Sequence, residues 1–566
     1  MKILSTVSLL CLLFGATHTL AQKKKPNVLI ILADDVGTGD VPGYWNNEIV
    51  DMPNLRALQE KGVTFMNAHS TPLCAPSRYS LLSGNYPHRG EGQFGTWDFK
   101  EGHNQFLDMQ QSIAEMLKMN DESWHTSMFG KWHIGGKVPG TYSNQTYSLS
   151  CCDNDWSQPM GQGPNEIGFD ESFYTMGGIQ SAPYSFFRNG YLTTKEDDIT
   201  MWEVGNYTKE NGVSIINKPG EGDPSWDSSD YNMKLVKEAY TFLVGHVADR
   251  SEDPFFMYFA LGQVHVPHSP PFEYLDGTKI AGRYEDPHLD LLFEMDLVIG
   301  SLMTKLEETN LMKDTIVIFC SDNGGLDMGY PNRVLRDKKS SIYEGGHRVP
   351  FVVRYDDVVP AGEVRDEHYI SLVDVYATIA EFTGSRIDQY SAQDSKSFAE
   401  YAKSASNTAG LRKYLHTWSR QKIYPTPDKH EIVRAESIHF GDLKYIRYLA
   451  PHEKEELYNL KTDIGETTNL LEISPDKYRK LRNKLRNNLR QEGSCPMDKA
   501  KSKLRNGKKR GQVVNCNWFE QDPQRRCRWQ RITGEKRCNS ICGRYRWWCR
   551  FYNPDLKEPR QAYVDL

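Results

Sequence analysis

Three continuous apolar runs constrain this chain more than any other feature of its sequence. They are Asn27 to Ala33 (NVLIILA), Pro254 to Leu261 (PFFMYFAL) and Thr315 to Cys320 (TIVIFC). Runs of this length without alternating polar residues are typical of strands that are buried on both faces of a parallel sheet. Such a sheet is covered by helices on both sides, so the runs predict an α/β sandwich with a mostly parallel central sheet.

Helical patterns occur between and after these runs. Pro53 to Lys61 predicts a helix with proline in its first turn. His288 to Glu308 has helical periodicity, and Ser371 to Thr383 predicts a helix for which Gly384 serves as the C-cap. Alternating buried strands and amphipathic helices are what the sandwich requires.

Paired polar residues follow two of the predicted strands. Asp34 and Asp35 come after the first apolar run, and Asp322 and Asn323 come after the third. In open α/β sheets, ligands bind beyond the carboxyl ends of the strands. Carboxylate and amide oxygens suit a hard divalent cation, with calcium as the first choice and magnesium as the second. Taken singly, each pair is more often a turn after a strand, and only their combination with the motif described next favours a metal site.

The motif is Cys74-Ala75-Pro76-Ser77-Arg78, which stands within the longer stretch PLCAPSRYSLLSG from Pro72 to Gly84. Taken alone, Cys74 would be a structural thiol or half of a disulfide. Together with the aspartate pairs, this stretch resembles the formylglycine-dependent (type I) sulfatases of the alkaline phosphatase superfamily. The resemblance implies that a formylglycine-generating enzyme oxidises Cys74 to formylglycine, whose hydrate is the nucleophile. Ser77 and the residues from Tyr79 to Leu82 predict a helix, which would hold the nucleophile at its positive amino end.

The same resemblance implies roles for the other residues of the site. The metal ligands of the family match Asp34, Asp35, Cys74, Asp322 and Asn323 in this chain, and the bound Ca²⁺ or Mg²⁺ ion would neutralise the sulfate oxygens. The catalytic residues of the family match Cys74, Arg78, Lys131, His133, His265 and Lys339.

Each of these catalytic residues has a role in the family. Arg78 would hold the formylglycine hydrate. Lys131 would contact sulfate, and His133, in the same Gly-Lys-Trp-His stretch, would assist regeneration of the aldehyde. His265 would donate a proton to the leaving group, whereas we assign no catalytic role to the neighbouring His268.

Lys339 would bridge the sulfate and the leaving-group oxygen. It stands five residues before Glu344, which opens the stretch EGGHRVP. Lys338 is adjacent, so the sequence leaves the register open by one residue. Asp337 stands where the family usually has glycine, which bears on the shape of this loop and not on the reaction.

The chain divides into four segments by composition. Residues 1–21 predict a secretory signal peptide, with Lys2 before an apolar run and small residues up to Ala21. Residues 22–385 would form the sulfatase catalytic domain and 386–490 a smaller α+β subdomain with a hairpin over Ile438 to Tyr448. Residues 491–566 form a Cys-rich basic extension. No later run is apolar enough to span a bilayer, so we expect a secreted or extracellular protein, with lysosomal and periplasmic destinations as alternatives.

Cysteine usage agrees with an oxidising compartment, whereas the two sequons are usable only in a eukaryotic source. Of 11 cysteines, six lie in the extension, which carries Cys495, Cys516, Cys527, Cys538, Cys542 and Cys549. Cys151 and Cys152 are adjacent, whereas Cys320 is predicted to be a buried free thiol. The cysteines of the extension predict disulfides, whose pairing the sequence does not give. The alternative is a zinc site, which is disfavoured because the spacing lacks repeated Cys-x-x-Cys pairs. Asn144 and Asn206 begin sequons for N-glycosylation.

Charge and composition indicate the kind of partner. The net charge of -6 favours no nucleic-acid partner. Between Cys495 and Arg550 there are 16 Lys or Arg residues and four tryptophans, which suit an anionic sugar polymer. The alternative is a disulfide-stapled surface extension without a binding role. The function predicted is therefore a secreted sulfatase that hydrolyses sulfate monoesters of a sulfated carbohydrate. The alternatives are an arylsulfatase of small substrates, a phosphodiesterase or phosphonate hydrolase of the same superfamily, and a non-catalytic protein that binds sulfated glycans.

Overall fold

The computed structural model describes residues 24–492, apart from 46–48, 92–96, 98–102, 138–155, 204–214, 217, 327–333, 427–428 and 450. The predicted signal peptide, both sequons, Cys151, Cys152 and all six cysteines of the extension lie outside the described residues. Within the described part, no helix combines the length and the apolar character needed to cross a bilayer.

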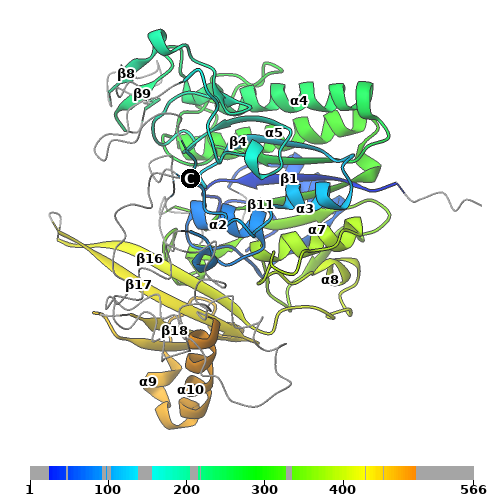
Figure 1. Ribbon diagram of the computed structural model, residues 1–566. Coiled ribbons are helices and arrows are strands. Elements are labelled where there is room, and N and C mark those ends of the chain that lie inside the picture. The colour runs from blue at the N-terminus through cyan, green and yellow to red at the C-terminus, as the bar shows by residue number, and fades with distance from the viewer. Residues whose placement is uncertain are drawn as a thin grey trace, which may run out of the picture.

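A large twisted sheet forms the centre of the first domain (Figure 1). In spatial order its strands are β14 (Glu363–Arg365), β2 (Val63–Phe65), β13 (Phe351–Arg354), β11 (Thr315–Ser321), β1 (Asn27–Ala33), β10 (Phe255–Ala260), β4 (His125–Lys131), β5 (Glu171–Thr175), β6 (Phe187–Arg188) and β7 (Tyr191–Leu192). The strands from β11 to β5 are all parallel, whereas β13, β6 and β7 run antiparallel to their neighbours. The predicted α/β sandwich with a mostly parallel sheet is confirmed.

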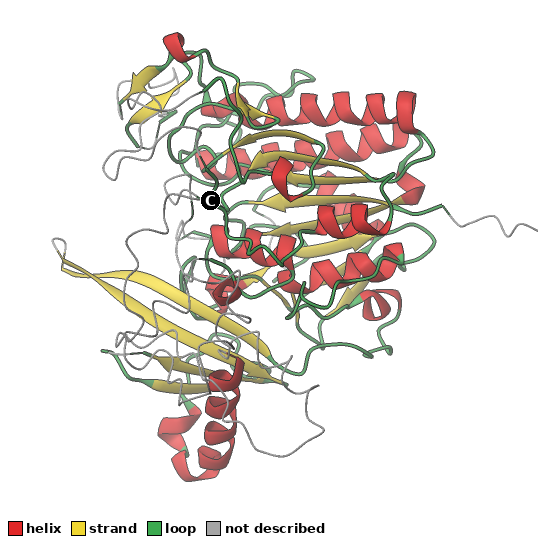
Figure 2. Cartoon of the chain, viewed as in Figure 1, coloured by secondary structure: helices red, strands yellow, loops and turns green. Residues whose placement is uncertain are grey.

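Helices cover both faces of this sheet, as Figure 2 shows. One face packs against α1 (Pro53–Lys61), α4 (Tyr231–Arg250) and α5 (Pro287–Glu308). The other packs against α2 (Cys74–Ser83), α3 (Ile113–Asn120), α7 (Val375–Thr383) and α8 (Ala399–Lys403).

The central strand β1 explains why the sequence of this region is apolar throughout. Its side chains alternate between the two cores, with Val28, Ile30 and Leu32 on one side and Leu29 and Ile31 on the other. Because both faces are buried, neither set of alternate positions is polar.

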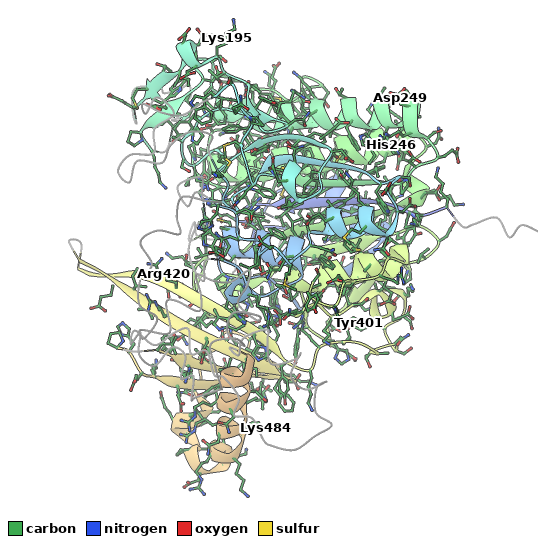
Figure 3. The ribbon with its side chains drawn as sticks, in the orientation of Figure 1. Lys195, His246, Asp249, Tyr401, Arg420 and Lys484 are labelled. Carbon is green, nitrogen blue, oxygen red and sulfur yellow. The ribbon has the colours of Figure 1, made fainter. Side chains whose placement is uncertain are left out.

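The second domain is built on a four-stranded antiparallel sheet. Its strands are β16 (Leu415–Thr426), β17 (Lys429–Phe440), β18 (Leu443–Tyr448) and β19 (Glu455–Asn459), followed by α9 (Leu470–Ile473) and α10 (Pro475–Glu492). Helix α10 buries Leu485 and Leu489 against Ile438 and Tyr445 of the sheet, and Lys484 lies on this helix in Figure 3. The hairpin predicted over Ile438 to Tyr448 is confirmed as the β17–β18 pair.

Smaller elements complete the fold. A three-stranded sheet joins β12 (Arg348–Val349), β3 (Ala68–His69) and β15 (Ile370–Ser371), a separate pair joins β8 (Thr200–Trp202) and β9 (Gly220–Gly222), and the short helix α6 covers Glu344–His347.

The predicted helices are confirmed with small differences at their ends. Helix α1 begins and ends where the sequence predicts, and α5 begins one residue earlier, at Pro287. Helix α7 begins only at Val375, because Ser371 and Asp374 form a capping box around a preceding 3-10 turn. Gly384 ends α7 in the left-handed conformation, with φ of 68°.

Candidate active site

The carboxyl ends of three neighbouring strands bring the predicted residues together. Asp34 and Asp35 follow β1, Asp322 follows β11, and Lys131 ends β4. Since these strands are parallel, their ends lie at one edge of the sheet. Hydrogen bonds fix the strand ends to one another: the Asp322 N–H donates to the Ala33 carbonyl at 3.1 Å, and the Asp35 N–H donates to Asp322 Oδ1 at 3.2 Å.

Three oxygens at this edge are buried without a hydrogen-bond donor in the described part of the chain. They are Asp34 Oδ1, Asp35 Oδ2 and Asn323 Oδ1. The orientation of the amide is set by its other end, because Asn323 Nδ2 donates to Asp35 Oδ1 at 2.7 Å. Buried oxygens without donors are costly unless a cation meets them. The Asp34, Cys74 and Asp322 side chains also offer ligand atoms within 4.8 Å of one another, so these residues fit a hard divalent cation.

Cys74 is the first residue of α2 and is buried at the amino end of the helix. Its Sγ marks where a formylglycine side chain would stand. Four residues on, the guanidinium of Arg78 is completely buried. Its Nε and Nη2 donate to Asp322 Oδ2 at 3.0 and 2.6 Å, and its Nη1 donates to the Lys131 carbonyl at 2.9 Å. Arg78 therefore ties α2 to the ends of β11 and β4.

Two lysines reach the aspartates that follow β1. Lys131 Nζ lies 2.5 Å from Asp34 Oδ2, and Lys339 Nζ lies 2.5 Å from Asp35 Oδ1. Burial alone would raise the pKa of both aspartates, but the nearby cations outweigh it and hold each pKa below its usual range. Lys339 is thus the lysine that reaches the site from the position five residues before Glu344.

Two histidines stand on either side of these charges. His133 Nδ1 lies 3.3 Å from Cys74 Sγ. His265 Nε2 lies 3.6 Å from Asp35 Oδ2, and its Nδ1 is held by the Val266 carbonyl at 2.8 Å. Burial and the Lys339 ammonium lower the pKa of His265 to about 3, so its imidazole is neutral in the absence of an anionic ligand. His268 instead bonds to the Val264 carbonyl at 3.0 Å.

The loop that carries Lys339 explains the departure from the family pattern. Asp337 has φ of 63°, in the left-handed region that glycine occupies most easily. Aspartate tolerates this region better than most residues because its short polar side chain bonds locally, and Asp337 Oδ1 accepts from the Lys338 N–H at 3.0 Å. The loop keeps the conformation that a glycine would have allowed.

Gln180 is a polar residue of this edge that the sequence analysis did not single out. It follows β5, the strand beside β4, and its buried Oε1 has no hydrogen-bond partner within the described ranges. A Cβ on Gly178 would lie 2.7 Å both from Gln180 Oε1 and from Lys131 Cδ, so glycine leaves room for both side chains. No motif marks Gln180. The signal available was its place after a strand, within a segment that contains two glycines.

Family models match most of the described chain. The model described as "Sulfatase" matches residues 26–385, and the one described as "N-sulphoglucosamine sulphohydrolase, C-terminal" matches residues 334–494.

Individual proteins and structures agree with these matches. The chain is 28% identical to the N-acetylgalactosamine-6-O-sulfatase of Bacteroides thetaiotaomicron over 510 residues, which cover 81% of this chain and 92% of that protein. It is also 28% identical over 547 residues to a sulfatase of Formosa agariphila, covering 86% and 93% of the two chains. A solved structure from a study of glycosaminoglycan metabolism by B. thetaiotaomicron superimposes with a TM-score of 0.66 at 25% identity, covering 82% of this chain and 98% of that one.

Proposed function

Because the chain belongs to the sulfatase family and is a sulfuric ester hydrolase, we propose that it hydrolyses sulfate monoesters of a sulfated carbohydrate with a formylglycine made from Cys74. The observation that carries this proposal is the set of three buried, donor-free oxygens on Asp34, Asp35 and Asn323, together with the Asp34 carboxylate's position within 4.8 Å of Cys74 Sγ. A catalytic metal beside a nucleophile is what attack on an anionic ester requires.

Two observations support a carbohydrate substrate. The relative from B. thetaiotaomicron acts, by its name, on an N-acetylgalactosamine sulfate. In addition, the β16–β17 hairpin of the second domain extends toward the side of the molecule at which β1 and β4 end (Figure 1), and β16 carries the exposed Arg420 there (Figure 3). His246, near the end of α4, lies on the opposite side. An exposed cation on this side of the molecule suits a polyanionic chain that extends beyond the reacting sugar.

Charge balance supports the binding of a metal together with an ester. Three carboxylates of the site face three side-chain cations, which are Arg78, Lys131 and Lys339. A divalent cation alone would leave two positive charges in a buried site, whereas an anionic sulfate ester would offset part of this excess. We therefore propose that Ca²⁺ is held by Asp34, Asp35, Asp322, Asn323 and residue 74, with Mg²⁺ as the second choice. When bound, the metal would supply positive charge to the sulfate oxygens.

The protein's own side chains divide the remaining work. Arg78, fixed by three hydrogen bonds, holds the side chain of residue 74 in place. Lys131 and Lys339 bind the sulfate oxygens, because both ammonium groups already lie at the buried edge where the ester must enter.

The two histidines handle protons. His133 Nδ1, beside Cys74 Sγ, is placed to exchange a proton with the modified side chain. His265, whose Nε2 lies 3.6 Å from Asp35 Oδ2, is placed to give a proton to the leaving alcohol.

The test is the release of inorganic sulfate from a panel of sulfated polysaccharides, oligosaccharides and aryl sulfates. The protein should be made in a host that forms formylglycine, with the modification verified by mass spectrometry of the peptide that carries residue 74. The matched control is Cys74→Ala, which keeps a small side chain at the start of α2. We expect release from a carbohydrate sulfate that disappears in the control.

Other outcomes would redirect the proposal. Release that persists in Cys74→Ala would overturn the role of this residue. Release from aryl sulfates alone would replace the carbohydrate substrate by a small one. No release from any sulfate by a converted protein would favour phosphodiester or phosphonate substrates, and an unconverted Cys74 in the native protein would favour glycan binding without catalysis.

We also propose that the protein is exported, which rests on the apolar run after Lys2 and on the cysteine-rich extension. Sequencing the amino terminus of the mature protein tests this proposal, and a chain that still begins at Met1 in the exported fraction would contradict cleavage after Ala21.

A further inference from the structure

The loop that carries Lys339 rests directly on the short helix α6. A Cβ on Gly345 would lie 2.1 Å from the Asp337 carbonyl oxygen, and one on Gly346 would lie 2.1 Å from the Ser341 carbonyl oxygen. The Gly345 N–H also donates to the Arg336 carbonyl at 2.9 Å. With backbone against backbone and no side chain between them, any shift of α6 moves the loop.

Helix α6 is in turn held by the second domain. Its first residue, Glu344, is completely buried, and its Oε1 accepts from Lys444 Nζ at 2.9 Å and from His439 Nε2 at 2.8 Å. Lys444 and His439 are directly opposite each other on β18 and β17, so both reach the same carboxylate from one face of the sheet. Glu466 adds a third contact, because its Oε2 accepts from the Glu344 N–H at 2.7 Å and its Oε1 lies 2.9 Å from Lys444 Nζ.

The chain of contacts reaches the loop by a second route. Arg336 Nη1 donates to the Glu466 carbonyl at 2.6 Å and to Tyr458 Oη at 3.2 Å, and its guanidinium lies 3.7 Å from the centre of the Tyr343 ring. The second domain therefore contacts both helix α6 and the amino end of the Lys339 loop at Arg336.

This buried cluster resembles a metal site but is already filled. His69, Glu344 and His439 offer ligand atoms within 4.8 Å of one another. However, Glu344 Oε1 already accepts two hydrogen bonds, one of them from a completely buried ammonium. A metal at this position would have to displace Lys444 from Glu344 and would place a further positive charge beside a buried ammonium, which is unfavourable in a completely buried cluster. The geometry favours an internal ion pair.

We propose that Lys444 is a positioning residue for catalysis, which acts from the second domain through Glu344 and α6 to hold Lys339 against Asp35. This inference rests on the proposed role of Lys339 in the reaction. It gives the EGGHRVP stretch and the small domain a role in catalysis, although neither Glu344 nor Lys444 contacts the site itself. Loss of the ammonium would leave Glu344 with the more distant Arg348 guanidinium, 3.4 Å from its Oε2, and with the carboxylate of Glu466 beside it, which would free α6 to move.

The test compares kcat and KM for a small aryl sulfate in four variants of the full chain. Lys444→Met removes the charge and keeps a long side chain, and we expect kcat to fall about 10- to 100-fold, because small misplacements of a catalytic group cost this much. Lys444→Arg restores the charge and should recover most of the loss. Lys339→Ala should lower kcat at least as far. The double variant, with Lys444→Met and Lys339→Ala together, should be no slower than Lys339→Ala alone, because Lys444 acts only through Lys339.

The matched control is Arg412→Met. Arg412 forms another buried ion pair, which links the start of the second domain to the first domain. Its Nε donates to Asp374 Oδ2 at 2.7 Å. None of the hydrogen bonds given above for the Lys339 loop involves either residue. We expect this variant to lower the melting temperature and to keep the wild-type kcat. Glu344→Gln, which keeps the length of the side chain but removes the charge that pairs with Lys444, replaces Lys444→Met should that variant not fold, and should lower kcat in the same direction.

Each outcome separates the inference from the proposed function. A wild-type kcat in Lys444→Met, or in Glu344→Gln where it is the variant used, overturns the inference if Lys339→Ala is impaired. So does a double variant whose loss is the product of the two single losses, because Lys444 would then act independently of Lys339. A wild-type kcat in Lys339→Ala instead overturns the proposed role of this lysine.

Discussion

The stability of the contact between the two domains should depend on pH through His416. This residue lies on β16 and is 4% exposed, between the rings of Tyr86 and Trp418 at centroid distances of 5.9 and 6.1 Å. Burial and the guanidinium of Arg412 lower its pKa to about 3, with further positive charge from His88 and Arg89 and an opposing carboxylate on Asp394. In the unfolded chain, a histidine has a pKa of about 6.5.

The sign and the size of the effect follow from these two values. Below about pH 6.5 the unfolded chain binds a proton that the folded protein refuses, so the free energy of unfolding falls as the pH falls. At about pH 5 the medium is roughly 1.5 units below the unfolded pKa and still above the folded one. At about 1.36 kcal/mol per unit, His416 then destabilises the folded state by about 2 kcal/mol relative to about pH 8.

The assay is urea denaturation followed by tryptophan fluorescence at both pH values, for the wild type and for His416→Gln. Glutamine does not titrate, so the variant should lose about 2 kcal/mol less than the wild type between the two pH values. The control is Tyr86→Phe, which removes a hydroxyl that bonds to Arg412 at 2.7 Å and should lower stability equally at both values. Equal losses in the wild type and in His416→Gln would refute the reasoning.

Three further predictions concern the site and the extension. Ca²⁺ added after chelation should raise the melting temperature by mass action, and Asp35→Asn should weaken this response; a variant that responds like the wild type would contradict the metal site. His265→Gln should slow the hydrolysis of sulfate esters with poor leaving groups, such as simple alcohols, more than that of nitrophenyl sulfate. An equal effect on both in steady-state assays would exclude His265 as the proton donor. Removal of residues 491–566 should weaken binding to a sulfated polysaccharide, measured by calorimetry, more than turnover of an aryl sulfate, and equal losses would remove the binding role of the extension.

The sequence predicted the centre of this fold well because the relevant signals are local. A strand such as β1 is apolar at every position after Asn27, since it has a core on each face. Because β1 and β11 are parallel neighbours, the paired polar residues directly after them lie together at the carboxyl edge of the sheet. Cys74 likewise begins α2, as the residues after it predict.

The contacts made across long stretches of chain could not be predicted in this way. Strand β13 runs antiparallel between β11 and β2, which no local pattern indicates. Glu344 and Lys444 are 100 residues apart, and each alone has the sequence signature of an ordinary surface charge. Gln180 belongs to the same class, because its burial depends on how the segment after β5 folds over Lys131.

Buried carboxylates occur both at the active site and in the cluster around Glu344, but their hydrogen-bond partners differ. At the site, side-chain cations hold Asp34 and Asp35 ionised but leave three oxygens without donors, which suits a further cation. In the cluster beneath α6, Lys444 and His439 instead fill the acceptor capacity of Glu344 Oε1, and the same residue types form a closed structural contact. Buried acid, base and histidine thus have different consequences at the two places, and what distinguishes them is whether the carboxylate oxygen at the centre already has its donors.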